Sequence, residues 1–362
     1  MTWHDSMNFN PHRWMPWRTL WAWFLALWLP FVVLALGVVV TAYFRSAAIE
    51  DAHDVTFAKF EVSTERIHRA ISDRVVAHEQ ILRGGASLFD TLGTVSREQW
   101  ATYVAGLQLA SSYPGIQGLG FAEHVPASQK RAFVAHMREQ GWPAYAIRPE
   151  GERAEYGPVT YLEPGIDRNA RAMGFDMLSE PARKAAMHQA RDTGRPTITA
   201  KLKLVSETDP TAAYGFLIYL PVYRAGMVLD SPAKRAAALR GYVNSPMRIN
   251  DVLKGTLGNH AGEVGLQIFD GPAALAEALM YQDSETRPAP NGRSAPQGST
   301  VLSKTATIRF SNREWTVVFS TLSQPSAQEM GAANLVTFTG GLASLLLAEA
   351  PAAASKPASA EA

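Results

Sequence analysis

The chain has no cysteine, and this absence excludes disulfide bonds, thiolate metal sites and cysteine nucleophiles. An excess of charge of one sign is also missing, because 34 Lys and Arg stand against 33 Asp and Glu in 362 residues. A nucleic-acid-binding protein normally shows a clustered basic face, and a net charge of +1 gives no sign of one. We therefore expect no nucleic-acid partner.

Catalytic signatures are missing as well. His78-Glu79 lacks the second histidine of the H-E-x-x-H zinc motif, and no G-x-S-x-G nucleophile elbow occurs. Gly115, Gly118 and Gly120 have neither the spacing nor the strand-then-helix context of a phosphate-binding loop, so they predict a turn and a strand. The sequence predicts no catalytic residue, no metal site and no cofactor.

An uncharged apolar run is present at residues 20–44. A bilayer core needs roughly 20 such residues, and this run exceeds the roughly 7–15 of a signal peptide. Arg13 and Arg18 precede it, which favours a cytoplasmic N-terminus at residues 1–19. We therefore predict a transmembrane helix in the inner (plasma) membrane, with the residues that follow it on the periplasmic side.

A second uncharged run covers residues 330–348, where Asn334 and two adjacent glycines interrupt the apolar residues. It is just long enough to span a bilayer, so a second transmembrane helix and a non-spanning segment are both open. The tail at residues 349–362 is rich in Ala, Pro and Ser, and we expect it to be disordered.

Residues 45–93 predict a long helix without proline. Apolar side chains recur along it at spacings of three, four and seven, which places them on one stripe. The stripe consists of Phe60, Ile67, Ile71, Val75, His78, Leu82 and Phe89. A striped helix that continues from a membrane span is typical of a stalk that pairs with another stalk, so we predict a homodimer through this helix.

The remainder predicts the α+β class, in which two mixed antiparallel α/β units follow the long helix. We assign residues 94–235 to the first unit and residues 236–328 to the second. A capping box at Ser96–Gln99 predicts a helix start, and Pro181 suits the first position of another helix. The alternating residues from Ile198 to Val205 predict a strand.

Six ordered elements carry a family resemblance. They are PGIQGLGFA at residues 114–122, Asn169, GFDMLS at 174–179, Pro181-x-Arg183, AR-x-TG at 190–194 and GFLIY-x-PVY at 215–223. Together they resemble the CHASE domain, the extracytoplasmic sensor of plant cytokinin-receptor kinases and of many bacterial histidine kinases and diguanylate cyclases. The resemblance implies two PAS-like subdomains after a stalk helix, a small ligand held in the membrane-distal subdomain, and a dimeric chain.

The resemblance also implies a ligand site. In plant members of the family an aspartate of the D-M-L-S stretch hydrogen-bonds an adenine ring, and Asp176 occupies that position here. The expected ligand-binding residues are Asp176, Met177, Phe121, Tyr161, Leu202, Leu204, Phe216, Ile218 and Tyr219. Lys201 and Lys203 differ from the more apolar plant residues, so we expect either a cytokinin-like adenine derivative or a small anionic metabolite. A helix cap is the alternative role of Asp176, and hydrophobic core that of most of the apolar residues.

The predicted function is a membrane-anchored extracytoplasmic sensor that binds a small molecule and signals across the membrane. Family members carry a kinase or cyclase domain after a second span, and these 362 residues contain no signature of either. We therefore expect that this chain is not itself an enzyme and that the output domain lies outside it. A membrane-anchored periplasmic hydrolase and a passive solute-binding protein are the alternatives.

Overall fold

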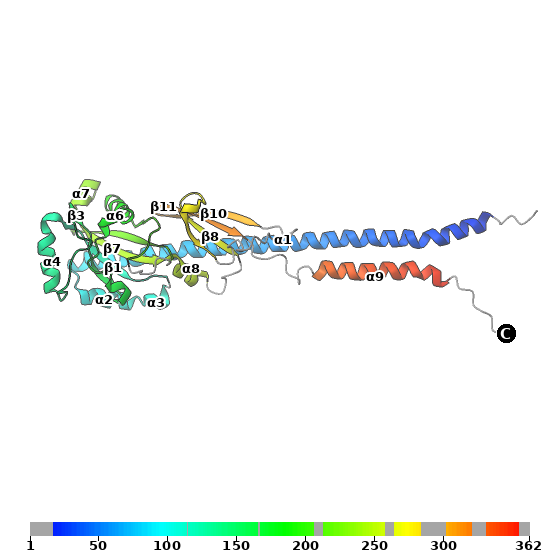
Figure 1. The fold of residues 1–362 in the computed structure, drawn as a ribbon, viewed down its shortest axis with the longest axis horizontal. Coiled ribbons are helices and arrows are strands. Elements are labelled where there is room, and N and C mark those ends of the chain that lie inside the picture. The colour runs from blue at the N-terminus through cyan, green and yellow to red at the C-terminus, as the bar shows by residue number, and fades with distance from the viewer. Residues whose placement is uncertain are drawn as a thin grey trace, which may run out of the picture. The chain divides into compact units, whose positions relative to one another are not determined.

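A computed structural model of the chain describes residues 17–113, 115–165, 167–205, 213–257, 264–283, 302–320 and 331–354. The chain divides into two compact units, one made of Met1–Lys59 with Pro325–Ala362 and the other of Phe60–Gln324. The predicted fold class is confirmed, because a long N-terminal apolar helix precedes antiparallel α/β sheets (Figure 1).

The long helix, α1 (Trp17–Leu92), is uninterrupted over 76 residues. Among the described helices it is the one long and apolar enough to cross a membrane, within Phe31–Leu92. Its apolar side chains Phe31, Leu36 and Phe44 are exposed, as a lipid-facing helix requires.

A second helix of the first unit is α9 (Gly331–Ala354). Its apolar part, Asn334–Leu346, is shorter than a membrane span normally is. The helix includes residues 349–354, so the expectation of a disordered tail was wrong for them, and the Ala-rich sequence there favours helix. The rest of that tail, and residues 1–16 of the predicted cytoplasmic segment, lie outside the described residues.

Small residues bring α1 and α9 into close contact within the first unit. A Cβ atom added at Gly37 would lie 2.8 Å from the Cβ of Ser344. One added at Gly340 would lie 3.1 Å from the Cβ of Thr41. Glycines in such positions allow two apolar helices to approach more closely than larger side chains would permit.

The predicted stripe on α1 is buried inside the second unit. All seven side chains of the stripe are at most 5% exposed. Phe89 stacks on Phe121 with ring centroids 4.1 Å apart, and a Cβ at Gly85 would lie only 3.2 Å from Val243. The stripe is therefore covered by its own chain, because an apolar period indicates burial but not which element does the covering.

The first sheet of this unit has five antiparallel strands in the order β4-β1-β7-β6-β5. Its strands are β1 (Leu119–Glu123), β4 (Val159–Glu163), β5 (Thr197–Ile198), β6 (Gly215–Tyr223) and β7 (Leu239–Arg248). β7 pairs with both β1 and β6 and so lies at the centre of the sheet. The predicted boundary between residues 235 and 236 assigned β7 to the second unit, but the strand belongs to the first sheet. Sequence order does not reveal which sheet a strand joins.

The second sheet has four antiparallel strands in the order β10-β11-β8-β9. They are β8 (Gly265–Asp270), β9 (Leu279–Gln282), β10 (Ser303–Phe310) and β11 (Arg313–Ser320). A short separate pair joins β2 (Val125–Pro126) to β3 (Glu155–Tyr156). We refer to the parts built on the five-stranded and four-stranded sheets as the first and second subdomains.

Short helices surround the two sheets (Figure 1). They are α2 (Arg97–Gly106), α3 (Leu109–Ser112), α4 (Lys130–Glu139), α5 (Asp167–Ala170), α6 (Pro181–Thr193), α7 (Pro232–Ala238) and α8 (Ile249–Leu257), with 3-10 turns η1 (Ala127–Gln129), η2 (Met177–Ser179) and η4 (Ala276–Ala278). The predicted capping box of Ser96 and Gln99 begins α2. Pro181 is the first residue of α6, and Gly194, at φ +70°, ends that helix in the left-handed conformation.

The strand predicted from Ile198 to Val205 is mostly absent. Only Thr197–Ile198 forms β5, and Leu202 makes one isolated bridge to Gly215. The backbone amide of Lys201 instead donates a hydrogen bond to Asp270 of the second subdomain, at 2.8 Å. A tertiary contact therefore overrides the local alternation of this segment.

The five-stranded sheet separates two hydrophobic cores. On the side that we call the α1 face, Phe121, Phe216 and Val243 pack with the stripe of α1. On the opposite side, the α6 face, Tyr219 packs with Met187 of α6. The α1-face core continues into the second subdomain, where Trp315 meets Phe216 edge-on at 4.9 Å between ring centroids.

His78 on the stripe yields a prediction about stability. Its ring is fully buried, neither ring nitrogen has a hydrogen-bond partner among the described residues, and burial lowers its pKa to about 4. As the pH falls, the unfolded chain takes up a proton at His78 before the folded chain does. The free energy of unfolding is therefore highest above about pH 6.5 and decreases as the pH drops toward 4.

We expect His78→Leu to remove this loss, which amounts to about 2 kcal/mol at about pH 5 because one pKa unit equals about 1.4 kcal/mol. Urea unfolding of the full-length protein in detergent, followed by tryptophan fluorescence between about pH 7.5 and 5, measures it. The exposed His136 provides the matched control, His136→Gln. An equal loss of stability in wild type and His78→Leu would contradict the prediction.

Candidate functional site

The nine predicted ligand-binding residues do not line one pocket. Phe121, Phe216 and Ile218 lie in the core on the α1 face. The four residues in the core on the α6 face are Met177, Leu202, Leu204 and Tyr219. The sheet stands between the two groups, because side chains alternate between its faces.

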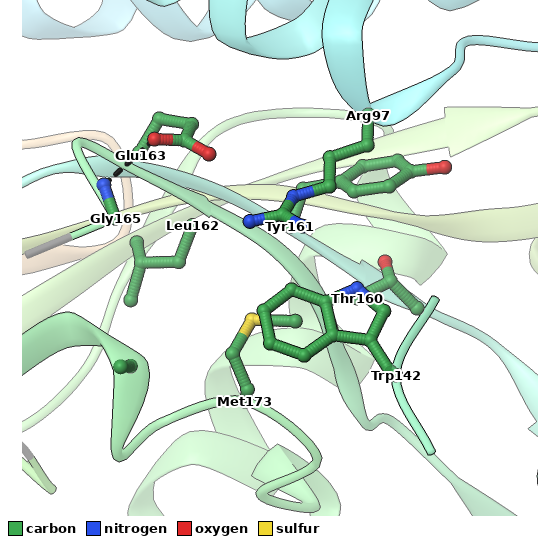
Figure 2. A pocket seen from close by; sticks show the side chains of 9 residues that line it. Arg97, Trp142, Thr160, Tyr161, Leu162, Glu163, Gly165 and Met173 are labelled. Atoms are coloured by element: carbon green, nitrogen blue, oxygen red, sulfur yellow. Dashed lines mark hydrogen bonds between the residues drawn. The ribbon is translucent and has the colours of Figure 1, made fainter. Parts of the chain in front are cut away.

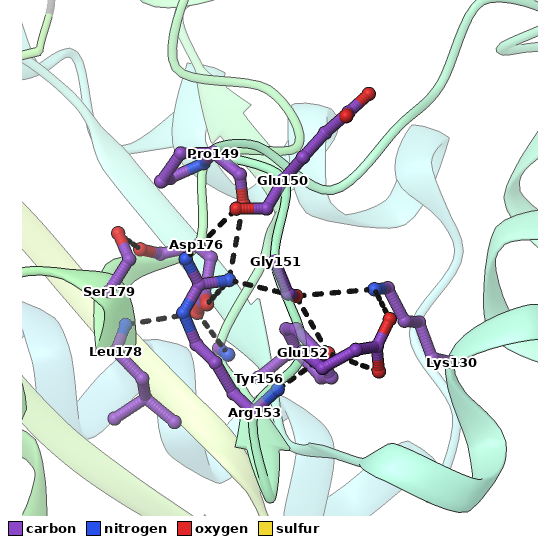
Figure 3. Close-up of polar contacts among 11 residues, drawn as sticks. Lys130, Pro149, Glu150, Gly151, Glu152, Arg153, Tyr156, Asp176, Leu178 and Ser179 are labelled. Carbon is purple, nitrogen blue, oxygen red and sulfur yellow. Dashed lines mark hydrogen bonds and ion pairs between the residues drawn. The ribbon is translucent and has the colours of Figure 1, made fainter.

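Asp176 lies beside the α6 face and is fully buried (Figure 3). Its Oδ1 accepts hydrogen bonds from the backbone amides of Gly157, at 2.7 Å, and Leu178, at 3.0 Å. The second of these bonds caps the short turn η2, so the alternative role of a helix cap is present. Its Oδ2 accepts no hydrogen bond from the described residues and lies 3.4 Å from Nη1 of Arg153.

The pKa of Asp176 is raised by burial. The two backbone amides and the charge of Arg153 lower it in part. Arg153 is itself held by Nη1, which donates to the carbonyl of Pro149 at 3.1 Å, and its side chain is a quarter exposed. In Figure 3 the guanidinium stands directly over the carboxylate. A group that is to reach Oδ2 must therefore share Asp176 with Arg153 or displace it.

Two more polar groups are buried near this position. The hydroxyl of Tyr219 lies 3.4 Å from Sδ of Met177. Arg183 donates from Nη2 to the carbonyl of Lys203 at 3.2 Å and stacks over the ring of Phe175, while its Nε has no partner in the described structure. The α6 face thus combines a packed apolar core with a few fixed polar groups.

The two lysines that suggested an anionic ligand point elsewhere. Nζ of Lys201 donates to the carbonyls of Glu277 and Leu279, the latter at 2.9 Å. Lys201 and Lys203 both lie against the ring of Tyr214, with Nζ 4.6 Å from its centroid. Neither ammonium contacts Asp176, so the main argument for an anion at Asp176 is weakened.

On the same side of the first subdomain, the carboxylate of Glu155 lies between the imidazole rings of His124 and His188. Oε2 of Glu155 lies 2.9 Å from Nε2 of His124, and Oε1 lies 3.0 Å from Nε2 of His188. These contacts, that of His124 first, lower the pKa of Glu155 to about 2. The ring of His124 therefore contacts Glu155 and not Asp176. Among the described residues no cluster of His, Asp and Glu has the geometry of a metal site.

A cavity of about 580 Å³ lies at the other side of the sheet, where α2 and α4 approach the edge formed by β1 and β4. Its polar lining includes Arg97, Glu98, Glu123, His136, Tyr161 and Arg240. A small extension of about 30 Å³ is lined by Arg97, Trp142, Tyr161 and Met173 (Figure 2). Of the nine predicted residues, Tyr161 lines this cavity.

Glu123 is the unusual residue of the cavity. Burial raises its pKa to about 7, against the opposing effect of Arg240 and Arg224. Sequence reasoning did not select Glu123 or Arg240 as ligand-binding residues. A signal was present, because Glu123 follows Phe121 by two residues, and that spacing places both on one face of β1.

Comparison with known proteins gives a family and a fold class. The model of the CHASE domain family matches residues 93–281. No curated protein sequence gives a significant match. The chain is similar in structure to the periplasmic sensory domain of the Campylobacter jejuni chemoreceptor Tlp1, with 10% identity, TM-score 0.45, and 76% of this chain and 96% of that chain covered.

Two further solved structures are similar at the same level. The ligand-binding domain of the Pseudomonas aeruginosa PAO1 amino acid chemoreceptor PctC, in complex with GABA, has 15% identity and TM-score 0.42, covering 72% of this chain and 98% of that chain. An extracellular ligand-binding receptor from Desulfohalobium retbaense DSM5692 has 11% identity and TM-score 0.43. This match covers 72% of our chain but only 40% of that receptor. At these identities the likeness concerns the fold alone.

The raised pKa of Glu123 yields a prediction about the protein without ligand. The pKa of Glu123 is about 7 in the folded chain and 4.5 ordinarily. The contribution of this group to the free energy of unfolding is therefore fully present below about pH 4.5 and is lost as the pH rises through 7. We expect Glu123→Gln to be more stable than wild type at about pH 8, by up to about 3 kcal/mol, and equal to it at about pH 4.5.

Urea unfolding of the full-length protein at the two pH values measures this difference. The control is Glu139→Gln, which changes an exposed carboxylate at the end of α4. A stability gain of Glu123→Gln that is the same at both pH values would show that Glu123 does not titrate as described.

Proposed function

Because the chain belongs to the CHASE domain family, we propose that it is a membrane-anchored sensor that binds a small molecule in its first subdomain and signals through α1. The family match supports an extracytoplasmic sensor. The apolar N-terminal helix fits a membrane protein with a periplasmic sensor region. A kinase or cyclase that receives the signal would lie outside this chain.

The observation that carries this proposal is the continuity of α1. One helix contains the apolar segment and the buried stripe. Its last turns are held against the five-stranded sheet by stacking of Phe89 on Phe121 and by the close approach of Gly85 to Val243. A ligand that favours one arrangement of this sheet would shift the population of α1 positions with it.

We place the ligand on the α6 face, at Asp176, Met177, Leu202, Leu204 and Tyr219. Oδ2 of Asp176 accepts no hydrogen bond from the described residues, so it can accept one from a ring N–H group that shares it with Arg153 or displaces Arg153. An adenine derivative has such groups and a flat apolar body. We therefore favour an adenine derivative over a small anion, which the carboxylate of Asp176 would repel.

A homodimer through α1 remains part of the proposal, but on a different side of the helix. Val55, Val62 and Val76 are about half exposed, and their numbers differ by multiples of seven. Such spacing places the three valines on one side of the helix, as in paired helices, with the charged Arg69 at the position between Val62 and Val76.

Asp176→Asn tests the ligand site. Asn keeps an oxygen that can cap η2 and accept from the amide of Gly157, but its amide group replaces the acceptor Oδ2 and removes the charge that pairs with Arg153. We expect binding of N6-substituted adenines, measured by thermal shift on the full-length protein in detergent, to fall at least tenfold. The control is Asp230→Asn at an exposed position.

Asp176→Ala shows what the cap contributes. It should lower the stability by about 1 kcal/mol or more, because two buried amides lose their acceptor. An adenine derivative that binds wild type and Asp176→Asn equally would refute the proposed site, and its chemical turnover would favour the hydrolase alternative.

The contact between α1 and α9 can be tested because the chain has no cysteine of its own. We expect Thr41→Cys with Gly340→Cys to form a disulfide in membranes, since the two Cβ atoms would lie close together. Labelling of free thiols with a maleimide measures the reaction. Thr41→Cys with Gly341→Cys is the control, because a Cβ at Gly341 meets nothing within 4 Å. Equal labelling of both pairs would contradict the contact.

A further inference from the structure

Two opposite charges on adjacent strands line the cavity between α2 and α4 without pairing with each other. Glu123 ends β1 and is opposite Gly241 in the register with β7, so Arg240 is the next residue along that strand. In the part of the chain that the structure describes, the Glu123 carboxylate has no hydrogen bond or ion pair. The guanidinium of Arg240 contacts the ring of Phe89, 5.0 Å from its centroid.

A second guanidinium stands at the same cavity. Arg97, at the first position of α2, lies over the ring of Trp142 at 4.3 Å, and it has no ion pair among the residues described. Glu98, the other acid of the lining, is different because Ser96 donates a hydrogen bond to it at 2.9 Å. The charged Arg and Glu side chains of the lining that have no polar partner among the described residues are therefore one carboxylate and two guanidiniums.

The rest of the lining is mixed, with an apolar part beside polar side chains such as Gln99, His136 and Gln140. Val95, Phe133, Met137 and Trp142 line the cavity together with the ring of Tyr161. A volume of about 580 Å³ lies within the range of about 300–1,000 Å³ that small-molecule sites occupy. The cavity can thus enclose a small molecule that has a charged end and an apolar remainder.

We propose that this cavity binds a zwitterion of the α-amino-acid class, with its ammonium group at Glu123 and its carboxylate at Arg240 and Arg97. An ammonium and a carboxylate on one carbon atom match two opposite charges on neighbouring strands. An amine alone would leave the guanidiniums without an anion, and a carboxylic acid alone would leave the partly buried carboxylate of Glu123 without a donor. Phe133, Met137 and Trp142 form the apolar part of the lining, which an apolar or aromatic ligand side chain can contact.

This site goes beyond the proposed adenine site, because it lies on the opposite side of the five-stranded sheet from Asp176. It also adjoins the helix that carries the signal. Leu92, the last residue of α1, lines the cavity, and Arg240 covers Phe89 one turn earlier. A ligand carboxylate that draws Arg240 from the Phe89 ring would change the packing at the end of α1.

Isothermal titration calorimetry on the full-length protein in nanodiscs tests the proposal, with apolar and aromatic L-amino acids as probes at about pH 8. Each active amino acid is compared with its decarboxylated amine and with its deaminated acid. We expect saturable binding of at least one amino acid and at least tenfold weaker binding of both analogues.

Glu123→Gln and Arg240→Met should each weaken the binding at least tenfold. Glu139→Gln, on the exposed end of α4, should leave it unchanged. Absence of saturable binding by every amino acid up to millimolar concentration overturns the proposal, as does binding that survives both cavity variants. Binding that Asp176→Asn abolishes while Glu123→Gln does not would also overturn it and would assign the amino acid to the α6 face.

Discussion

The packing of the α1 stripe into the five-stranded sheet is the interaction on which the rest of the structure depends. The stacked rings of Phe89 and Phe121 join the end of α1 to β1, and Trp100 adds α2 to the same cluster. This cluster forms one wall of the first subdomain core and lies next to the cavity. Both proposed ligands would therefore act on a sheet that packs directly against α1.

The alternation of side chains in the sheet explains why the two candidate sites are separate. Residues of β6 with even numbers, Phe216 and Ile218, face α1, whereas Leu217 and Tyr219 face α6. A sequence motif lists such neighbours side by side, although the backbone sends them to opposite faces. The motif GFLIYLPVY therefore marks an inner strand of the sheet, of which only the face that carries Tyr219 belongs to the proposed site.

Local chemistry made part of this structure predictable. The capping box at Ser96, the proline at 181 and the stripe of α1 are each defined by residues close in sequence, and each prediction was confirmed. The sheet membership of β7 and the partner of the stripe depend on contacts between distant residues, which periodicity does not encode. The same limit applies to the cavity, because Arg97, Glu123 and Arg240 come from three separate elements.

The contact between Phe216 and Trp315 makes the two subdomains share one hydrophobic core. Neither sheet can then lose its packing without exposing apolar surface of the other, so the pair should unfold as a single cooperative unit. A molecule bound only to the first subdomain would thus slow the exchange of backbone amide hydrogens in β8 and β11, strands that it never touches.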